Sequence, residues 1–164
     1  MANSPDHHLL EALLDAWDRN NTITVNLLHA VPEDAMEFTP TDGSPSIARL
    51  FTHMAYVRLI FVFEDAPEFV TDKPAWTVEH DRDRLAQLLN HSAAAVRDAV
   101  RNRIETGREM IRHYDHPLLM LQHLIWHEGY HHGQIKLTLK LAGRPLADDD
   151  VGRGTWGIWM DKTK

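Results

Sequence analysis

The hydrophobic positions of this chain recur at helical spacing in four long stretches. Apolar residues three or four positions apart indicate an amphipathic helix, and strict alternation of apolar and polar residues would indicate a half-buried strand. Prolines and glycines separate the stretches, and no convincing strand pattern occurs between them. The sequence therefore predicts four long helices, at 5–31, 44–63, 81–106 and 116–141.

The second of these stretches has a clear start signal. Ser44 followed by Pro45 is typical of a helix cap and a first-turn proline. We predict that one apolar stripe faces the core, made of Leu50, His53, Met54, Val57, Ile60 and Phe61. Residues 32–45 and 65–80 are predicted to be irregular, and a short helical piece at 108–112 is compatible with the pattern.

Four amphipathic helices predict an all-α fold, an antiparallel four-helix bundle formed by a single domain over residues 1–164. The connections at 32–44 and 64–80 are long for a simple up-down bundle, so a crossover connection stays open. The glycine-rich C-terminal tail contains Trp156 and Trp159. Disordered segments are poor in aromatic residues, so we expect this tail to pack on the bundle.

Composition narrows the classes of function. The chain is 43% hydrophobic and 25% charged, with a formal charge of −7. The acidic balance argues against nucleic-acid binding, and no apolar run is long enough to span a membrane. Cysteine is absent, so disulfides and thiolate metal ligands are excluded. With no secretory signal at the N-terminus, we expect a cytoplasmic protein.

Histidine is the exceptional residue, with twelve in the chain. The string HEGYH places His127 and His131 one helical turn apart, where both imidazoles can reach one metal ion. The pair His123 and His127 has the same spacing. His123 and His131 are about 12 Å apart along the helix, so all three cannot share one ion. One adjacent pair is therefore predicted to bind a metal with ligands from elsewhere.

The best further ligand is His53 on the apolar stripe of the second helix. A histidine that points into a core needs a partner for its nitrogens. Three imidazoles from two helices leave a coordination position open, as in catalytic sites. Gly129 and Gly133 each cost about 1 kcal/mol in a helix. We expect something to approach them closely: another backbone, the metal site or a second subunit.

These residues resemble the DinB/YfiT-like superfamily of metal-binding four-helix bundles. The resemblance rests on Leu-Phe-Thr-His53, on the string HEGYHHGQI at 127–135 and on LAGRP at 141–145, and it spans nearly the whole chain. It implies a divalent ion, usually nickel or zinc, at His53, His127 and His131. It also implies a homodimer. The family's usual arginine before Gly-Gln is here His132, which removes a permanent cation near the site.

The resemblance also indicates the chemistry. Members with known activities include transferases that use low-molecular-weight thiols such as bacillithiol or mycothiol, and a thiol-dependent isomerase. We therefore expect an S-transferase with a small-molecule substrate and a thiol cosubstrate. A metal-dependent hydrolase with metal-bound hydroxide as nucleophile and a non-catalytic metal-binding stress protein stay as alternatives. A zinc protease is disfavoured, because the chain offers no strand to pair with a peptide and no downstream third ligand.

Glu128 is the candidate catalytic residue. In zinc proteases the glutamate of H-E-x-x-H activates the metal-bound water. Here Glu128 lies about 100° around the helix from His127. It is therefore predicted either to act as a general base or to face solvent or a dimer partner.

Overall fold

A computed structural model describes residues 5–162 of the chain. Within these residues the fold is all-helical, as predicted, and contains no strand. The four long helices are α1 (Pro5–Ala30), α2 (Ile47–Asp65), α3 (Arg82–Thr106) and α4 (Pro117–Leu141). Three short helical segments accompany them: η1 (Glu33–Ala35), α5 (Asp148–Val151) and η2 (Trp156–Met160). No described helix combines the length and the apolarity that a membrane crossing requires.

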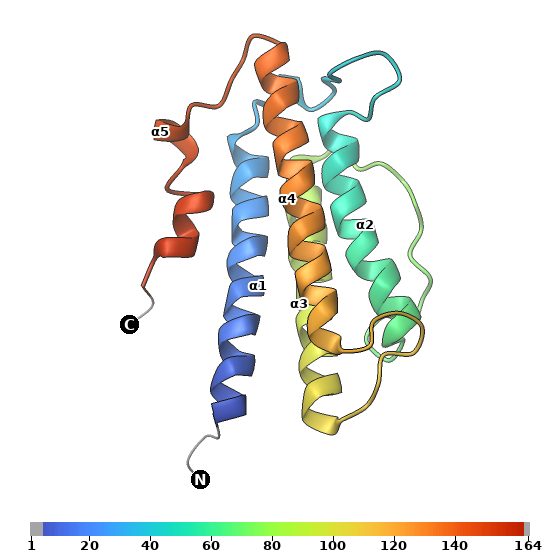
Figure 1. Cartoon of the computed structure of the whole chain (residues 1–164). Coiled ribbons are helices and arrows are strands. Elements are labelled where there is room, and N and C mark those ends of the chain that lie inside the picture. Colours follow the sequence, from blue (N-terminus) through green and yellow to red (C-terminus); the bar gives the residue numbers. More distant parts are fainter. Residues whose placement is uncertain (1–4, 163–164) are drawn as a thin grey trace.

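The four long helices run up, down, down and up (Figure 1). The connection at 66–81 travels the length of the bundle, so that α3 runs parallel to α2 instead of returning beside it (Figure 1). Hydrogen bonds between Thr52 and Glu79, near the starts of α2 and α3, agree with this direction. The bundle therefore contains a crossover connection, the alternative to a simple up-down bundle that the length of this connection suggested. The crossover sends residues 66–81 along the outside of α2.

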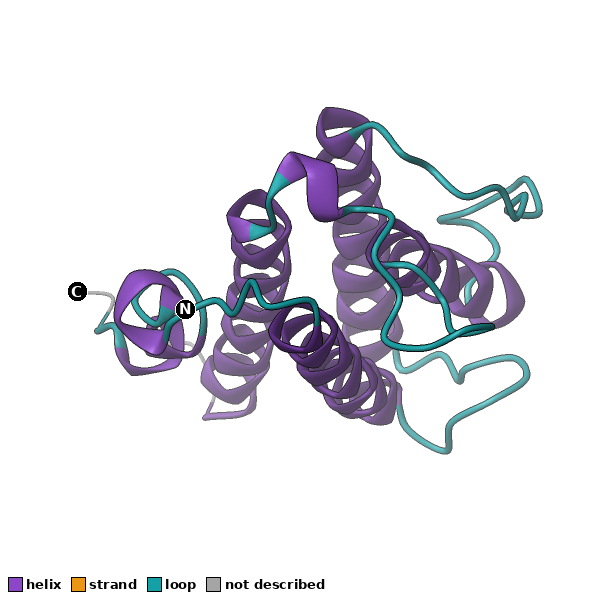
Figure 2. Cartoon of the chain, turned by 90° about the horizontal axis from the view of Figure 1, so that it is seen from above, coloured by secondary structure: helices purple, strands orange, loops and turns teal. Residues whose placement is uncertain are grey.

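Each of α1 and α2 packs against both α3 and α4, so the first two helices lie diagonally across the bundle. Viewed from above, the long helices lie together, with the C-terminal segment at one edge and extended loops at the other (Figure 2). The apolar core has two parts. One surrounds Phe51 and Leu85 near the start of α2, and the other surrounds Trp17 and Val96 farther down.

The buried face of α2 differs from the predicted stripe. The helix starts later than predicted, at Ile47, and its cap is Ser46, whose hydroxyl accepts a hydrogen bond from the backbone N–H of Arg49. The fully buried positions include Phe51, Met54, Arg58 and Val62. Val57, Ile60 and Phe61 from the predicted stripe are only half-buried. The stripe that faces the core thus contains a charged residue, Arg58. A search for hydrophobic residues alone does not identify this stripe.

The short helical piece compatible with 108–112 is absent. α3 ends at Thr106, its cap Gly107 adopts a left-handed conformation with φ of 67°, and residues 108–116 form a loop. The buried carboxylate of Asp65 organises this loop by accepting hydrogen bonds from the backbone N–H groups of Arg112 and His113. Side-chain acceptors that capture backbone donors in this way favour turns over a helical turn.

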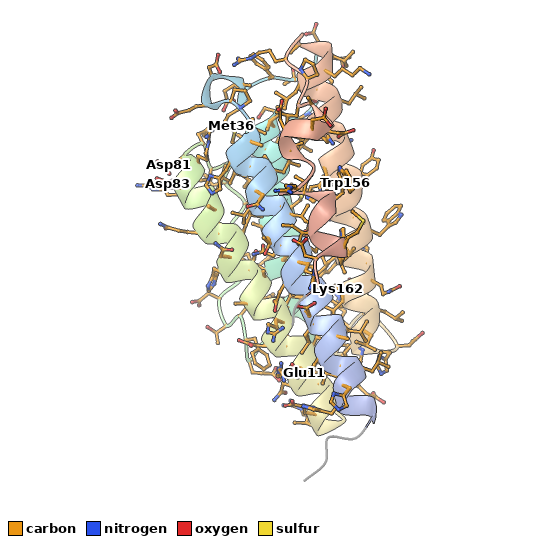
Figure 3. The ribbon with its side chains drawn as sticks, turned by 90° about the vertical axis from the view of Figure 1, so that its left-hand side faces the viewer. Glu11, Met36, Asp81, Asp83, Trp156 and Lys162 are labelled. Carbon is orange, nitrogen blue, oxygen red and sulfur yellow. The ribbon has the colours of Figure 1, made fainter. Side chains whose placement is uncertain are left out.

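The C-terminal segment packs on the bundle as expected, although its tryptophans are not what it buries. Figure 3 shows it lying along the outside of α1, with Trp156 on η2. Asn26 donates a hydrogen bond to the carbonyl of Gly154, and Arg19 donates to the carbonyls of Ile158 and Asp161. Trp156 and Trp159 both remain exposed. Polar side chains of α1 that bind backbone carbonyls therefore hold the segment in place.

Candidate metal centre

Facing positions on α2 and α4 bring His53, His127 and His131 together. One nitrogen from each of the three imidazoles lies within 4.8 Å of the others. The Nε2 atom of His127 is 3.1 Å from Nε2 of His53 and 3.0 Å from Nε2 of His131. The three residues predicted as metal ligands are thus the ones that converge. The three rings form a compact triangle, with 4.4–5.1 Å between their centres.

The spacing of these nitrogens fits a shared ion. Zinc–nitrogen bonds of about 2.0–2.1 Å place two ligand nitrogens on one ion about 3 Å apart. The two shortest Nε2 separations have that length. No carboxylate belongs to the group, and neutral imidazoles are good ligands for zinc, nickel, copper and iron. The donor set therefore suits a borderline transition-metal ion better than magnesium or calcium.

The electrostatics also favour metal binding at neutral pH. Burial is the main cause that lowers the pKa of His127 to about 4, and the neighbouring His131 and His53 lower it further. Burial likewise lowers the pKa of His53, with smaller contributions from His131 and Arg49. A metal ligand must present an unprotonated nitrogen. These two imidazoles are neutral near pH 7 and carry a lone pair for the ion.

A hydrogen bond from the next turn of α4 orients one of these histidines. Nδ1 of His131 lies 2.7 Å from Oε1 of Gln134, and the amide of Gln134 donates to the hydroxyl of Tyr130. Because the amide oxygen only accepts, Nδ1 of His131 carries the proton and Nε2 keeps its lone pair for the ion. His127 differs, because its Nδ1 is buried without a hydrogen-bond partner among the described residues.

A cavity of about 330 Å³ opens beside the histidines. Its walls come from the start of α2, from α4, from the loop before α2 and from the connection at 66–81. The lining residues are Gly43, Ser44, Pro45, Arg49, Leu50, His53, Trp76, His131 and Gln134. Two of the three histidines line it, so a small molecule can reach the centre from this side. Such access is expected of a catalytic site rather than a closed structural one.

Glu128 faces the interior of the bundle. Its side chain is fully buried, which contradicts the expectation that it faces solvent or a dimer partner. Its carboxylate accepts two hydrogen bonds of 2.6 Å from the guanidinium of Arg58. Asn20 and Thr24 on α1 donate to the same carboxylate. Both oxygens are thus engaged in a bridge between helices, and a general-base role for Glu128 stays a prediction that these contacts do not favour.

The other histidines of the cluster lie outside the group. His123 is exposed, and its Nδ1 lies 2.8 Å from the hydroxyl of Tyr114. His132 faces α1, where its Nε2 lies 2.9 Å from the hydroxyl of Thr24. His132 does not line the cavity. His132 therefore belongs to the contact between α1 and α4 and adds nothing to the cavity wall.

Arg58 is the important residue that sequence reasoning missed. It also donates to the carbonyl of Leu89 and the side chain of Asn21, and its guanidinium lies 4.9 Å from the ring of Trp17. Its spacing in the sequence could have shown that it lies on the buried face. Arg58 follows Phe51 by seven residues and Met54 by four, so it shares their face of the helix. A charged residue on a buried face needs a charged partner.

Comparison with known proteins agrees with this architecture. The model of the DinB family matches residues 1–159, nearly the whole chain. No curated protein matches the chain, and no solved structure does. With its four long helices and its three converging histidines, the chain belongs to the DinB family.

Proposed function

We propose that this protein is a divalent-metal-dependent enzyme that transfers a low-molecular-weight thiol to a small electrophile. One observation carries the proposal: three imidazoles converge on one point, and two of them line an open cavity. A site with three protein ligands and access for a small molecule leaves room for an exchangeable ligand. Membership of the DinB family is compatible with a metal-binding protein, and the resemblance described in the sequence analysis suggests the thiol transfer.

The chemistry follows from the ligand set. His53, His127 and His131 would hold zinc or nickel, and a divalent ion lowers the pKa of a thiol or water that it binds. Gln134 would keep the ring of His131 in position, as hydrogen bonds to metal-ligating histidines generally do. The thiol would release its proton to solvent, its sulfur would attack the electrophilic carbon and form the carbon–sulfur bond, and the leaving group would depart with the electron pair of the broken bond.

We also propose that the protein is a homodimer that pairs through the outer face of α4. This face carries Trp126, Tyr130, Leu137 and Leu141, all more than half exposed. A Cβ atom added at Gly129 or at Gly133 would have none of the neighbouring heavy atoms that could block it within 4 Å. The close approach expected at these glycines therefore does not come from the described residues of the same chain. A second subunit would supply it and would cover the exposed aromatic rings.

The decisive experiment measures metal content and thiol transfer on the same untagged protein. We expect about one equivalent of zinc or nickel per chain, and metal-dependent conjugation of a small thiol to 1-chloro-2,4-dinitrobenzene with release of chloride. His53→Ala should lose both. The matched control is His123→Ala, which removes an imidazole outside the group and should retain both.

The outcomes separate the proposal from its alternatives. Full metal occupancy in His53→Ala would refute the three-histidine centre. Stoichiometric metal with no conjugation of any thiol would refute the transferase. Metal-dependent turnover of an ester without added thiol would favour the hydrolase instead. Bound metal with no turnover in either assay would favour the non-catalytic metal-binding protein.

A further inference from the structure

The cavity beside the histidines contains a cation that the metal centre does not use. Arg49 lines the cavity one helical turn before His53 on α2. We propose that Arg49 and Trp76 form a subsite for a carboxylate, so that the small molecule bound at the metal centre is anionic. This inference rests on the proposed function and specifies its substrate class.

Arg49 combines a place in the cavity wall with the lack of a carboxylate partner among the described residues. Eight other arginines among the described residues pair with a carboxylate: Arg19, Arg58, Arg97, Arg101, Arg103, Arg108, Arg112 and Arg144. The structure gives the side chain of Arg49 no hydrogen bond and no ion pair within residues 5–162. In an acidic chain, a guanidinium that remains unpaired while it lines a cavity is available for a ligand.

The ring of Trp76 lies beside this guanidinium in the cavity wall. The Cζ atom of Arg49 lies 5.8 Å from the centre of the Trp76 ring, within cation–π range. The same ring meets His53 edge-on, with 6.1 Å between the ring centres. Tyr56 supports the indole from α2, with 5.1 Å between the rings. Trp76 thus connects the cation to the metal centre and forms an apolar wall beside both.

The charges in the cavity select for an anion. Of the described residues that line it, none carries a carboxylate. The three metal-ligating imidazoles are acceptors without negative charge, so a divalent ion held there would keep its full charge. An arginine and a divalent cation then face the same space of about 330 Å³. Guanidinium groups bind carboxylates through paired, charge-assisted hydrogen bonds.

The spacing sets the length of the ligand. Side chains four residues apart on a helix have Cβ atoms about 6 Å apart. A molecule that reaches the histidine nitrogens and Arg49 together therefore has its carboxylate only a few bonds from the atom at the metal. A short thiol acid such as 3-mercaptopropionate has this form, with sulfur at one end and a carboxylate at the other.

The test compares two thiols of equal length on the cobalt-substituted protein. The probes are 3-mercaptopropionate, which has a carboxylate, and 3-mercaptopropanol, which has a hydroxyl in its place. Binding is followed by the sulfur-to-cobalt charge-transfer band. We expect the wild type to prefer the carboxylate by about tenfold, the equivalent of one charge-assisted interaction. Arg49→Met should bind the two thiols about equally, and Arg49→Lys should keep part of the preference for the carboxylate.

Arg84→Met is the matched control. Arg84 is exposed on α3, has no recorded ion pair and does not line the cavity, so this variant changes the net charge by the same amount. It should retain the tenfold preference. An equal preference in the wild type and in Arg49→Met would overturn the subsite. A preference lost equally in Arg84→Met would also overturn it, because overall charge would then be the cause.

A second measurement keeps the subsite separate from the thiol reaction. Propionate is titrated into the cobalt protein while the indole N–H resonance of Trp76, identified with Trp76→Phe, is followed by NMR. If neither thiol gives a charge-transfer band but propionate shifts this resonance in an Arg49-dependent manner, the thiol transferase fails and the carboxylate subsite stands. If a thiol binds the cobalt but propionate leaves the resonance unmoved, the subsite fails and the transferase stands.

Discussion

Arg58 and Glu128 form a bidentate ion pair in the middle of the bundle, with Nε–Oε1 and Nη2–Oε2 distances of 2.6 Å and with both side chains fully buried. The pair joins α2 to α4, and Glu128 is the sequence neighbour of His127. With partners from α1 and α3, the ion pair links all four long helices between the two parts of the apolar core. It therefore fixes the two helices that carry the three converging histidines.

Removing one member of the pair should destabilise the protein strongly. Arg58→Met leaves the buried carboxylate of Glu128 without its counter-charge, and we expect a loss of about 3–5 kcal/mol in the free energy of unfolding. Urea denaturation measures it. The double variant Arg58→Met/Glu128→Leu should recover most of this loss. A double variant as unstable as the single one would show that the pair is not the cause.

Glu128→Gln separates a positioning role from a general-base role. If Glu128 positions α4, the variant should bind metal more weakly but turn over at nearly the wild-type rate once the metal is saturating. Titration of the metal during the conjugation assay gives both quantities. A fall in kcat of about a hundredfold or more at full metal occupancy would instead identify Glu128 as the proton acceptor.

Gln134→Leu should weaken metal binding by about 10–100-fold, because the hydrogen bond that fixes the ring of His131 is lost. Competition with a chromophoric chelator measures the affinity. Gln122→Leu, an exposed position on the same helix, is the control and should bind metal as the wild type does. Equal affinities in all three proteins would refute the orienting role of Gln134.

The α4 face should control the oligomeric state. Trp126 is 72% exposed and stacks on Tyr130, so Trp126→Glu places a charge in the proposed interface and should yield a monomer. Sedimentation velocity of the wild type should show a dimer. Leu9→Glu changes an exposed leucine of α1 and should remain dimeric. A monomeric wild type would contradict the proposed dimer.

Acid should weaken the ion pair between Arg103, near the end of α3, and Glu68, just after α2. Nη1 of Arg103 lies 2.5 Å from Oε1 of Glu68. The hydrogen bond from Arg103 lowers the pKa of Glu68 below its usual 4.5. A lowered carboxyl pKa adds stability that is complete above about pH 4.5 and is lost as the pH falls through the lowered value.

Glu68→Gln tests this dependence. The variant should unfold more easily at pH 7, by about 1–2 kcal/mol, because it leaves the buried Arg103 without a counter-charge. The difference from the wild type should disappear in acid, where Glu68 is protonated. Glu109→Gln, at an exposed position with no recorded ion pair, should show no such pH dependence. Chemical denaturation at each pH provides the free energies.

The histidine pair on α4 was predictable because the relationship between its two members is local. The helical period alone places His127 and His131 one turn apart, and His53 stood out as a histidine on a largely apolar stripe. The helix ends at Thr106 and Leu141 were also predictable, since glycine and proline act on the nearest backbone. These features depend on a few adjacent residues, so the sequence determines them without knowledge of packing.

Tertiary structure decided the rest. The sequence determined four helices and the turn-by-turn placement of the histidines, but not that α3 runs parallel to α2. That direction brings Trp76 from the connection at 66–81 beside His53. Nor did the sequence show that Arg58 pairs with Glu128, which lies 70 residues away. Helical periodicity acts within one helix, whereas the partner of a buried charge depends on which helices become neighbours when all four pack.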